Sequence, residues 1–180
     1  MAYWWVNQGQ TFAAERQAGI LWAPTAMANG GTRPYWTAMT DLVAGDVVFH
    51  YAHQRIMAVG RVRTPAQLHP RPASLPSQLW QQDGWLAELN STDLETPIHR
   101  NEIPLEWRRP RQEPCFDVNG QVVLGYLFPL SDGFAGKLLD YFQDRWPPIP
   151  PVNPTLNSTR SLGQIRGLSG HAADADCAAW

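Results

Sequence analysis

Residues 44–62 read AGDVVFHYAHQRIMAVGRV, and this stretch decides the fold. Gly45 and Asp46 form a tight turn, and residues 47–51 after it are rich in the β-branched and aromatic side chains that favour strands. Residues 52–54 make a short loop, and residues 55–62 return as a second apolar run. We therefore predict a β-hairpin here and, with it, a β-sheet as the centre of the molecule.

Short apolar runs separated by turn residues extend this prediction along the chain. The Asn119-Gly120 dipeptide between two apolar runs predicts a second hairpin. The connections are too short for repeated βαβ units, so we predict an α+β fold, a small mixed β-barrel of five to six strands flanked by two to three helices. The candidate segments for these strands are 3–8, 20–23, 47–51, 55–62, 84–89 and the two arms of 115–124. The expected helices are 11–18, 34–42 and 131–146.

The composition fits a single domain, because 44% of the 180 residues are apolar and 17% are charged. We expect this domain to span residues 1–150 and residues 151–180, rich in Ser, Gly, Ala and Asn, to form a linker or flexible tail. No apolar run approaches a membrane span, and the N-terminus lacks the basic segment of a signal peptide. Cys115 and Cys177 fit no zinc spacing. These features predict a cytoplasmic protein without membrane, metal or cofactor.

The charged and aromatic residues narrow the possible partners. A net charge of −2 argues against binding of polyanions through a broad basic surface. Lys137 is the only lysine among the 14 basic residues, and the arginines offer planar guanidinium groups that suit phosphates. The chain also has nine tryptophans. A nucleic-acid contact would therefore rely on a few placed arginines and on aromatic rings.

The order of the aromatic strands resembles a known family. The residues that carry the resemblance are YWWVNQG at 3–9, LWAP at 21–24, PYW at 34–36, LVAGDVVFHY at 42–51 and IMAVG at 56–60. Together they resemble the EVE domain of the PUA-like superfamily, which is related to the YTH and ASCH domains. In particular, they look like the EVE-like modules that precede HNH nuclease domains in modification-dependent restriction enzymes. The resemblance covers residues 3–146.

This resemblance implies a pseudo-barrel that takes one modified base into an aromatic pocket. It places Asn7, Gln8 and Trp22 in that pocket, at the end of the first strand and on the second. Amide side chains both donate and accept hydrogen bonds, so Gln10 is a further candidate for reading the edge of the base. The other candidates for the base pocket are Trp36, His50, Tyr51, Trp80 and Trp85.

Arginines near the expected pocket are candidates for contacts to the phosphates that flank the base. Arg33 lies in a glycine-containing loop, and Arg55, Arg61 and Arg63 lie on or beside the returning strand of the first hairpin. Such contacts position a duplex without reading its sequence. The expected partners are modified double-stranded DNA and a nuclease domain or partner subunit, and a homodimer is a further option.

Motifs for catalysis are weak in this chain. It has no Gly-rich phosphate loop, HExxH motif or Cys-His zinc pattern, so we expect a binding module rather than an enzyme, with no catalytic residue. The main prediction is recognition of 5-methylcytosine or 5-hydroxymethylcytosine in DNA by base flipping, as the sensor of a modification-dependent restriction system. Two alternatives are a YTH-like reader of N6-methyladenine or RNA, and an ASCH-like hydrolase of nucleic acids.

Overall fold

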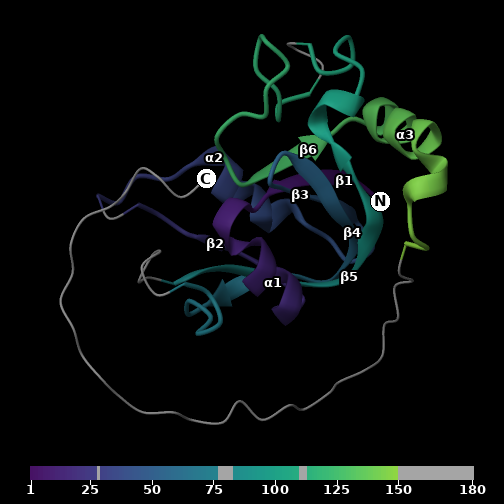
Figure 1. The fold of residues 1–180 in the computed structure, drawn as a ribbon. Helices are drawn as coiled ribbons and strands as arrows, with labels where there is room; N and C mark the ends of the chain where they lie inside the picture. The colour runs from purple at the N-terminus through teal and green to yellow at the C-terminus, as the bar shows by residue number, and fades with distance from the viewer. Residues whose placement is uncertain (28, 77–82, 110–112, 150–180) are drawn as a thin grey trace.

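A computed structural model describes residues 1–27, 29–76, 83–109 and 113–149 and shows one curled six-stranded sheet with helices against it (Figure 1). The strands follow the order β2-β5-β4-β3-β1-β6. All neighbouring pairs are antiparallel except β1 and β3, which are parallel. The strands are β1 Tyr3–Asn7, β2 Ile20–Pro24, β3 Val47–Ala52, β4 Arg55–His69, β5 Gly84–His99 and β6 Leu127–Leu130.

The predicted hairpin of residues 47–62 is confirmed as β3 and β4. His53 and Gln54 between the two strands both have positive φ angles, of 50° and 62°, as a two-residue hairpin turn requires. Strands β4 and β5 are both much longer than predicted. Strand β4 continues to His69, and β5 continues to His99. Their pairing shifts register at three places, and such bulges bend and twist a sheet. These two strands therefore give the sheet its curl.

Asp46 fastens the N-terminal strand to the turn before β3. The side chain is fully buried, and its carboxylate accepts hydrogen bonds from the Ala2 amide at 2.7 Å, Trp4 Nε1 at 3.0 Å and the Val43 amide at 3.1 Å. It thereby satisfies two donors from the N-terminal segment, 44 and 42 residues away in sequence, and one donor from the adjacent turn. This arrangement fixes the parallel register in which Tyr3 of β1 lies opposite Val47 of β3.

Local sequence signals explain one end each of α1 and α3. The helices are α1 Phe12–Ala18, α2 Pro34–Thr37 and α3 Asp132–Tyr141, and the short 3-10 helices are η1 Gly9–Thr11, η2 Ala38–Asp41, η3 Arg100–Glu102 and η4 Gln143–Arg145. Gly19 ends α1 in the left-handed conformation with φ of 67°. The Ser131 hydroxyl begins α3 by accepting the Phe134 amide.

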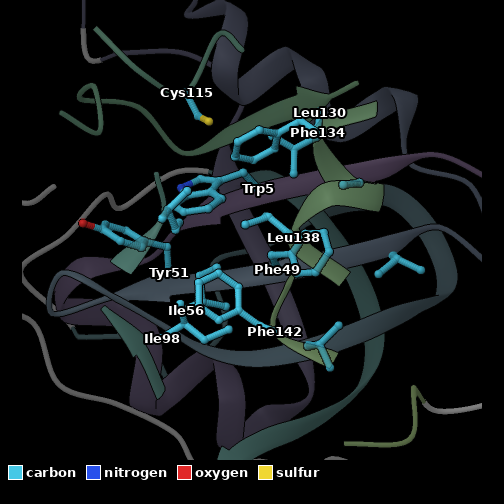
Figure 2. Packing of buried hydrophobic residues seen from close by; sticks show 14 of the residues in the cluster. Trp5, Phe49, Tyr51, Ile56, Ile98, Cys115, Leu130, Phe134, Leu138 and Phe142 are labelled. Atoms are coloured by element: carbon cyan, nitrogen blue, oxygen red, sulfur yellow. The ribbon is translucent and has the colours of Figure 1, made fainter. Parts of the chain in front are cut away.

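Two apolar clusters lie on the two faces of the sheet. The first, shown in Figure 2, contains Trp5, Phe49 and Tyr51 of the central strands and is covered by Phe134 and Leu138 of α3. The second holds Trp4, Leu21, Trp36, Met39, Leu42 and Tyr126. Trp4 and Trp5 therefore serve opposite faces, as successive residues of a strand must. The predicted α+β small barrel with a mixed six-stranded sheet is confirmed.

Three predicted elements differ in detail. Residues 34–42 form a single α-helical turn, α2, followed by η2 rather than one continuous helix. The Asn119-Gly120 turn forms, with Gly120 at φ of 71°, but its arms are joined only by an isolated bridge between Phe116 and Val122. The helix predicted over 131–146 ends at Tyr141. Within the described residues, no helix is both long and apolar enough to cross a membrane.

Candidate functional site

A chain of buried polar groups lies where β1 ends. Ser91 Oγ lies 3.0 Å from His50 Nε2, and His50 Nδ1 lies 2.8 Å from Gln8 Oε1. The amide nitrogen of Gln8 donates to Glu15 Oε2, which also accepts the Tyr126 hydroxyl at 2.8 Å. These five side chains come from β5, β3, the end of β1, α1 and the segment before β6, and we call them the buried network.

The direction of each hydrogen bond in the buried network follows from donor and acceptor types. Because the Gln8 nitrogen donates to Glu15, the Gln8 oxygen is the acceptor, and His50 must donate its Nδ1–H to it. His50 Nε2 is then the acceptor for the Ser91 hydroxyl. Burial, together with the positive charge of Arg16, lowers the pKa of His50 to about 3, so the imidazole is neutral at physiological pH.

Glu15 is the ionisable centre of the buried network. Its side chain is only 1% exposed, and this burial raises the pKa of its carboxyl from 4.5 to about 8. Hydrogen bonds from Gln8, Tyr126 and Thr11 act in the opposite direction but are outweighed by the loss of solvation. The proton on this carboxyl is therefore bound in the folded protein at pH values where the unfolded chain has released it.

This raised pKa predicts that the protein loses stability as the pH rises from 6.5 to 8. Glu15 binds its proton more tightly in the folded state, so its contribution is complete below pH 4.5 and is lost as the pH approaches 8. The lowered pKa of His50 acts only between about pH 3 and 6.5, in the opposite sense. Urea unfolding should show a decline of about 1.4 kcal/mol per pH unit at most above pH 6.5.

The Glu15→Gln variant should lack this decline, because an amide does not titrate. Glu95→Gln is a matched control, since Glu95 is exposed on β5 and lies outside the buried network. A wild-type stability that stays constant or rises between pH 6.5 and 8 would contradict the assignment.

Trp22 on β2 is held by the buried network through its backbone. Its amide donates to the Tyr126 hydroxyl at 2.9 Å, and its indole ring is fully buried. Among the described residues it is part of neither apolar cluster. A Cβ added to Gly84 would lie within 2.5 Å of two carbons of the ring, so glycine is required there. The strand position of Trp22 is thus fixed, and its ring packs against the backbone of Gly84.

The remaining base-pocket candidates lie in different surroundings. Asn7 is 9% exposed, and its side-chain amide donates to the Val123 carbonyl at 3.4 Å. Gln10 is exposed on η1, and Trp85 of β5 is half-buried. Trp36 is buried in the second cluster. The structure thus brings Asn7 and Gln8 together at the end of β1 but leaves Gln10 facing solvent.

The predicted roles of Gln8, His50 and Tyr51 need correction. Both ends of the Gln8 amide and both ring nitrogens of His50 are bonded inside the buried network, so neither offers a free edge to a base. Tyr51 packs on Trp5 with ring centroids 4.9 Å apart, and Figure 2 shows it within the first cluster. Trp80 lies outside the described residues.

The four candidate phosphate contacts do not form one patch. Arg55 is the first residue of β4, whereas Arg63 is eight residues further along, which is roughly 26 Å at the rise of a β-strand. Arg61 donates to the Gly45 carbonyl at 3.0 Å, and Arg63 pairs with Glu88 at 2.8 Å. Arg33 is exposed just before α2. Arg55 and Arg63 are therefore too far apart along β4 to contact neighbouring phosphates.

Sequence reasoning missed Glu15, Tyr126, Ser91 and Arg16. Glu15 is the one buried residue of α1, and nothing in the sequence around it sets it apart from its exposed neighbours. The other three carry no local signal. Within the described parts of the chain, no group of three or more His, Cys, Asp or Glu side chains is arranged to hold a metal ion.

Comparison with known proteins identifies the fold. The YTH domain of Pho92, solved in complex with m6A, is 9% identical and superposes over 79% of this chain and 83% of that domain with a TM-score of 0.52. A protein from Pseudomonas putida is 10% identical and matches 77% of this chain and 98% of its own length with a TM-score of 0.51. No protein-family model and no curated protein matches the sequence. The chain therefore shares the fold of these two proteins, a small mixed α+β barrel.

Proposed function

We propose that this protein is a reader of a modified base in nucleic acid and that it holds the base beside Trp22. The observation that carries the proposal is the setting of this residue. It is a buried tryptophan outside both core clusters, with its strand fixed by the Tyr126 hydroxyl and its ring against Gly84. The ring has no exposed surface in the unliganded protein, so the proposal requires the side chains that cover it to move aside when the base enters, while the strand that carries the ring stays fixed.

The energetics of base recognition explain why such a fixed ring is useful. A base inside a duplex must be swung out of the stack, which costs a few kcal/mol. Stacking on an aromatic ring returns about 1–3 kcal/mol, and a single buried methyl group adds only about 0.8 kcal/mol. Preference for a methylated base therefore depends on a rigid site that fits closely. The buried network supplies this rigidity, because it joins five elements of the fold by hydrogen bonds.

Within this class, we propose that the ligand is 5-methylcytosine or 5-hydroxymethylcytosine in double-stranded DNA. The sequence resemblance to EVE modules supports this choice. In this proposal the chain is a binding module, and cleavage belongs to a nuclease domain or partner subunit of a modification-dependent restriction system. Asn7 then remains the best placed polar side chain, since it lies at the end of β1 next to Gln8 and retains some exposure.

A YTH-like reader of N6-methyladenine is the second candidate, because the Pho92 YTH domain that shares the fold was solved in complex with m6A. The two candidates differ in the base and in the sugar of the strand. They therefore separate in one binding experiment that varies both features.

The experiment is a panel of fluorescent oligonucleotides with one central modification. Matched DNA duplexes carry cytosine, 5-methylcytosine, 5-hydroxymethylcytosine, adenine or N6-methyladenine, and single-stranded RNAs carry adenine or N6-methyladenosine. We expect at least tenfold tighter binding to one modified cytosine duplex than to its unmodified match. Tightest binding to N6-methyladenosine in RNA would favour the second candidate, and equal binding to every probe would contradict both.

A further inference from the structure

A surface pocket of about 370 Å³ lies between the end of α1 and strands β4 and β5. Its walls include two arginines, Arg16 of α1 and Arg63 of β4, together with Gly19, Asn90 and Ser91. The register of β4 against β5 shifts between Val62 and Thr64, so Arg63 lies in a β-bulge. Bulges redirect side chains out of the regular alternation. The fold thus brings two guanidinium groups from separate elements to one hollow.

Each guanidinium is held by one carboxylate but keeps other donors. Arg16 Nε lies 2.7 Å from Asp93 Oδ1, and Arg63 Nη2 lies 2.8 Å from Glu88 Oε2. A guanidinium has five N–H donors, so each of these single contacts leaves most of them for another ligand. Asp93 is 64% exposed, and the Arg63–Glu88 pair is about 40% exposed on both sides. Ion pairs in such exposed positions contribute little and yield to a competing anion.

The C-terminal end of α1 beside this pocket carries a partial negative charge, which the two guanidinium groups must outweigh for an anion to bind. The Glu15 and Arg16 carbonyls of the last turn both accept the Gly19 amide. The Arg16 side chain is only 25% exposed, so its charge acts in a partly desolvated setting. Arginine in such a setting binds phosphate oxygens through two parallel hydrogen bonds.

The pocket is also joined to the candidate base site. Ser91 in its wall is hydrogen-bonded to His50, and His50 is hydrogen-bonded to Gln8 at the end of β1. A strand whose base is held near Gln8 and Trp22 must continue across the adjacent surface. Two hydrogen bonds therefore connect the wall of the pocket to Gln8, the neighbour in sequence of Asn7 at the proposed base site.

We propose that the pocket between Arg16 and Arg63 binds a backbone phosphate of the nucleic-acid strand whose base is read, with Asp93 and Glu88 as the carboxylates that the phosphate displaces. This inference rests on the proposed reader function and adds a contact that is independent of base identity. Of the arginines singled out from the sequence, it involves only Arg63, and it adds Arg16.

The test measures how the affinity for modified and unmodified DNA duplexes depends on salt concentration. Arg16→Ala should lower the affinity for both duplexes by about fivefold to tenfold at 100 mM salt and reduce the slope of log K against log salt by about one. Asp93→Asn should have the opposite effect and tighten binding severalfold, because it frees Arg16. Lys137→Gln, which removes one positive charge from α3 outside the lining of this pocket, should leave the slope unchanged.

The outcomes separate this inference from the proposed function. A variant Arg16→Ala with wild-type affinity and slope, in a protein that still prefers modified DNA, would overturn the phosphate site alone. Weaker binding in Asp93→Asn would also overturn it, since it would show that the carboxylate supports the ligand. A wild-type protein that binds no oligonucleotide would overturn both proposals.

Discussion

Replacing Trp22 with leucine is expected to reduce the preference for modified over unmodified oligonucleotides by tenfold or more. Because only the modified base is proposed to leave the stack, loss of the aromatic stacking partner, worth about 1–3 kcal/mol, should weaken binding of the modified duplex alone by roughly fivefold to 150-fold. The measured quantity is the ratio of two dissociation constants. This ratio does not change if part of the variant is unfolded, because unfolded protein lowers the apparent affinity for both probes equally.

Trp5 provides the matched control for this prediction. Like Trp22 it is a fully buried tryptophan, but it belongs to the first apolar cluster, where it contacts Tyr51 and Phe116. Trp5→Leu should destabilise the fold by a few kcal/mol without changing the ratio. Trp22→Phe keeps a ring and most of the volume, and it should retain part of the preference. Equal ratios in the wild type and in Trp22→Leu would contradict the assignment of Trp22.

The second large effect is expected for Asp46→Ala, which should lower the free energy of unfolding by about 3 kcal/mol or more. The substitution leaves the amides of Ala2 and Val43 and the indole nitrogen of Trp4 without their acceptor. Each buried donor that loses its partner costs about 1–3 kcal/mol. Urea unfolding followed by tryptophan fluorescence measures this loss directly.

Asp46→Asn should lose less stability than Asp46→Ala, because the amide keeps one oxygen acceptor. Asp41→Ala is the control, since Asp41 is an exposed residue of η2 close to the same turn, and its replacement should change stability by no more than about 0.5 kcal/mol. Equal losses in Asp41→Ala and Asp46→Ala would show that the buried carboxylate does not fasten β1 to the turn.

The sequence was a good guide wherever neighbouring residues determine structure. The hairpin of β3 and β4 follows from apolar runs around a short loop, and Gly19 ends α1 as a glycine after a short helix should. The lengths of β4 and β5 could not be predicted, because Pro65 lacks the amide hydrogen that a strand interior uses and so disfavours continuation of the strand beyond residue 63. In the structure Pro65 lies in a region where the register shifts, which is where a strand tolerates a residue without an amide hydrogen.

The candidate site shows the opposite situation. Tyr126 and Glu15 are 111 residues apart, and Ser91 and His50 are 41 apart, so no local pattern could pair them. Gln8 was identified as important from its place after the first strand, but its amide proved to be part of the buried network. Asn7 and Trp22 remain candidates. Sequence reasoning therefore pointed to side chains around the end of β1, but it could not distinguish those bonded inside the buried network from those that remain candidates for a ligand.

The central claim is that a single base leaves the stack and is held by this protein, and fluorescence of 2-aminopurine tests it most directly. The probe is placed next to a modified cytosine in a duplex, where stacking on its neighbours quenches its emission. If the modified base is flipped, emission should rise clearly when the wild-type protein binds the modified duplex, and it should rise much less with the unmodified duplex. Tight binding of the modified duplex with unchanged emission would contradict base flipping, because the base would then still be stacked.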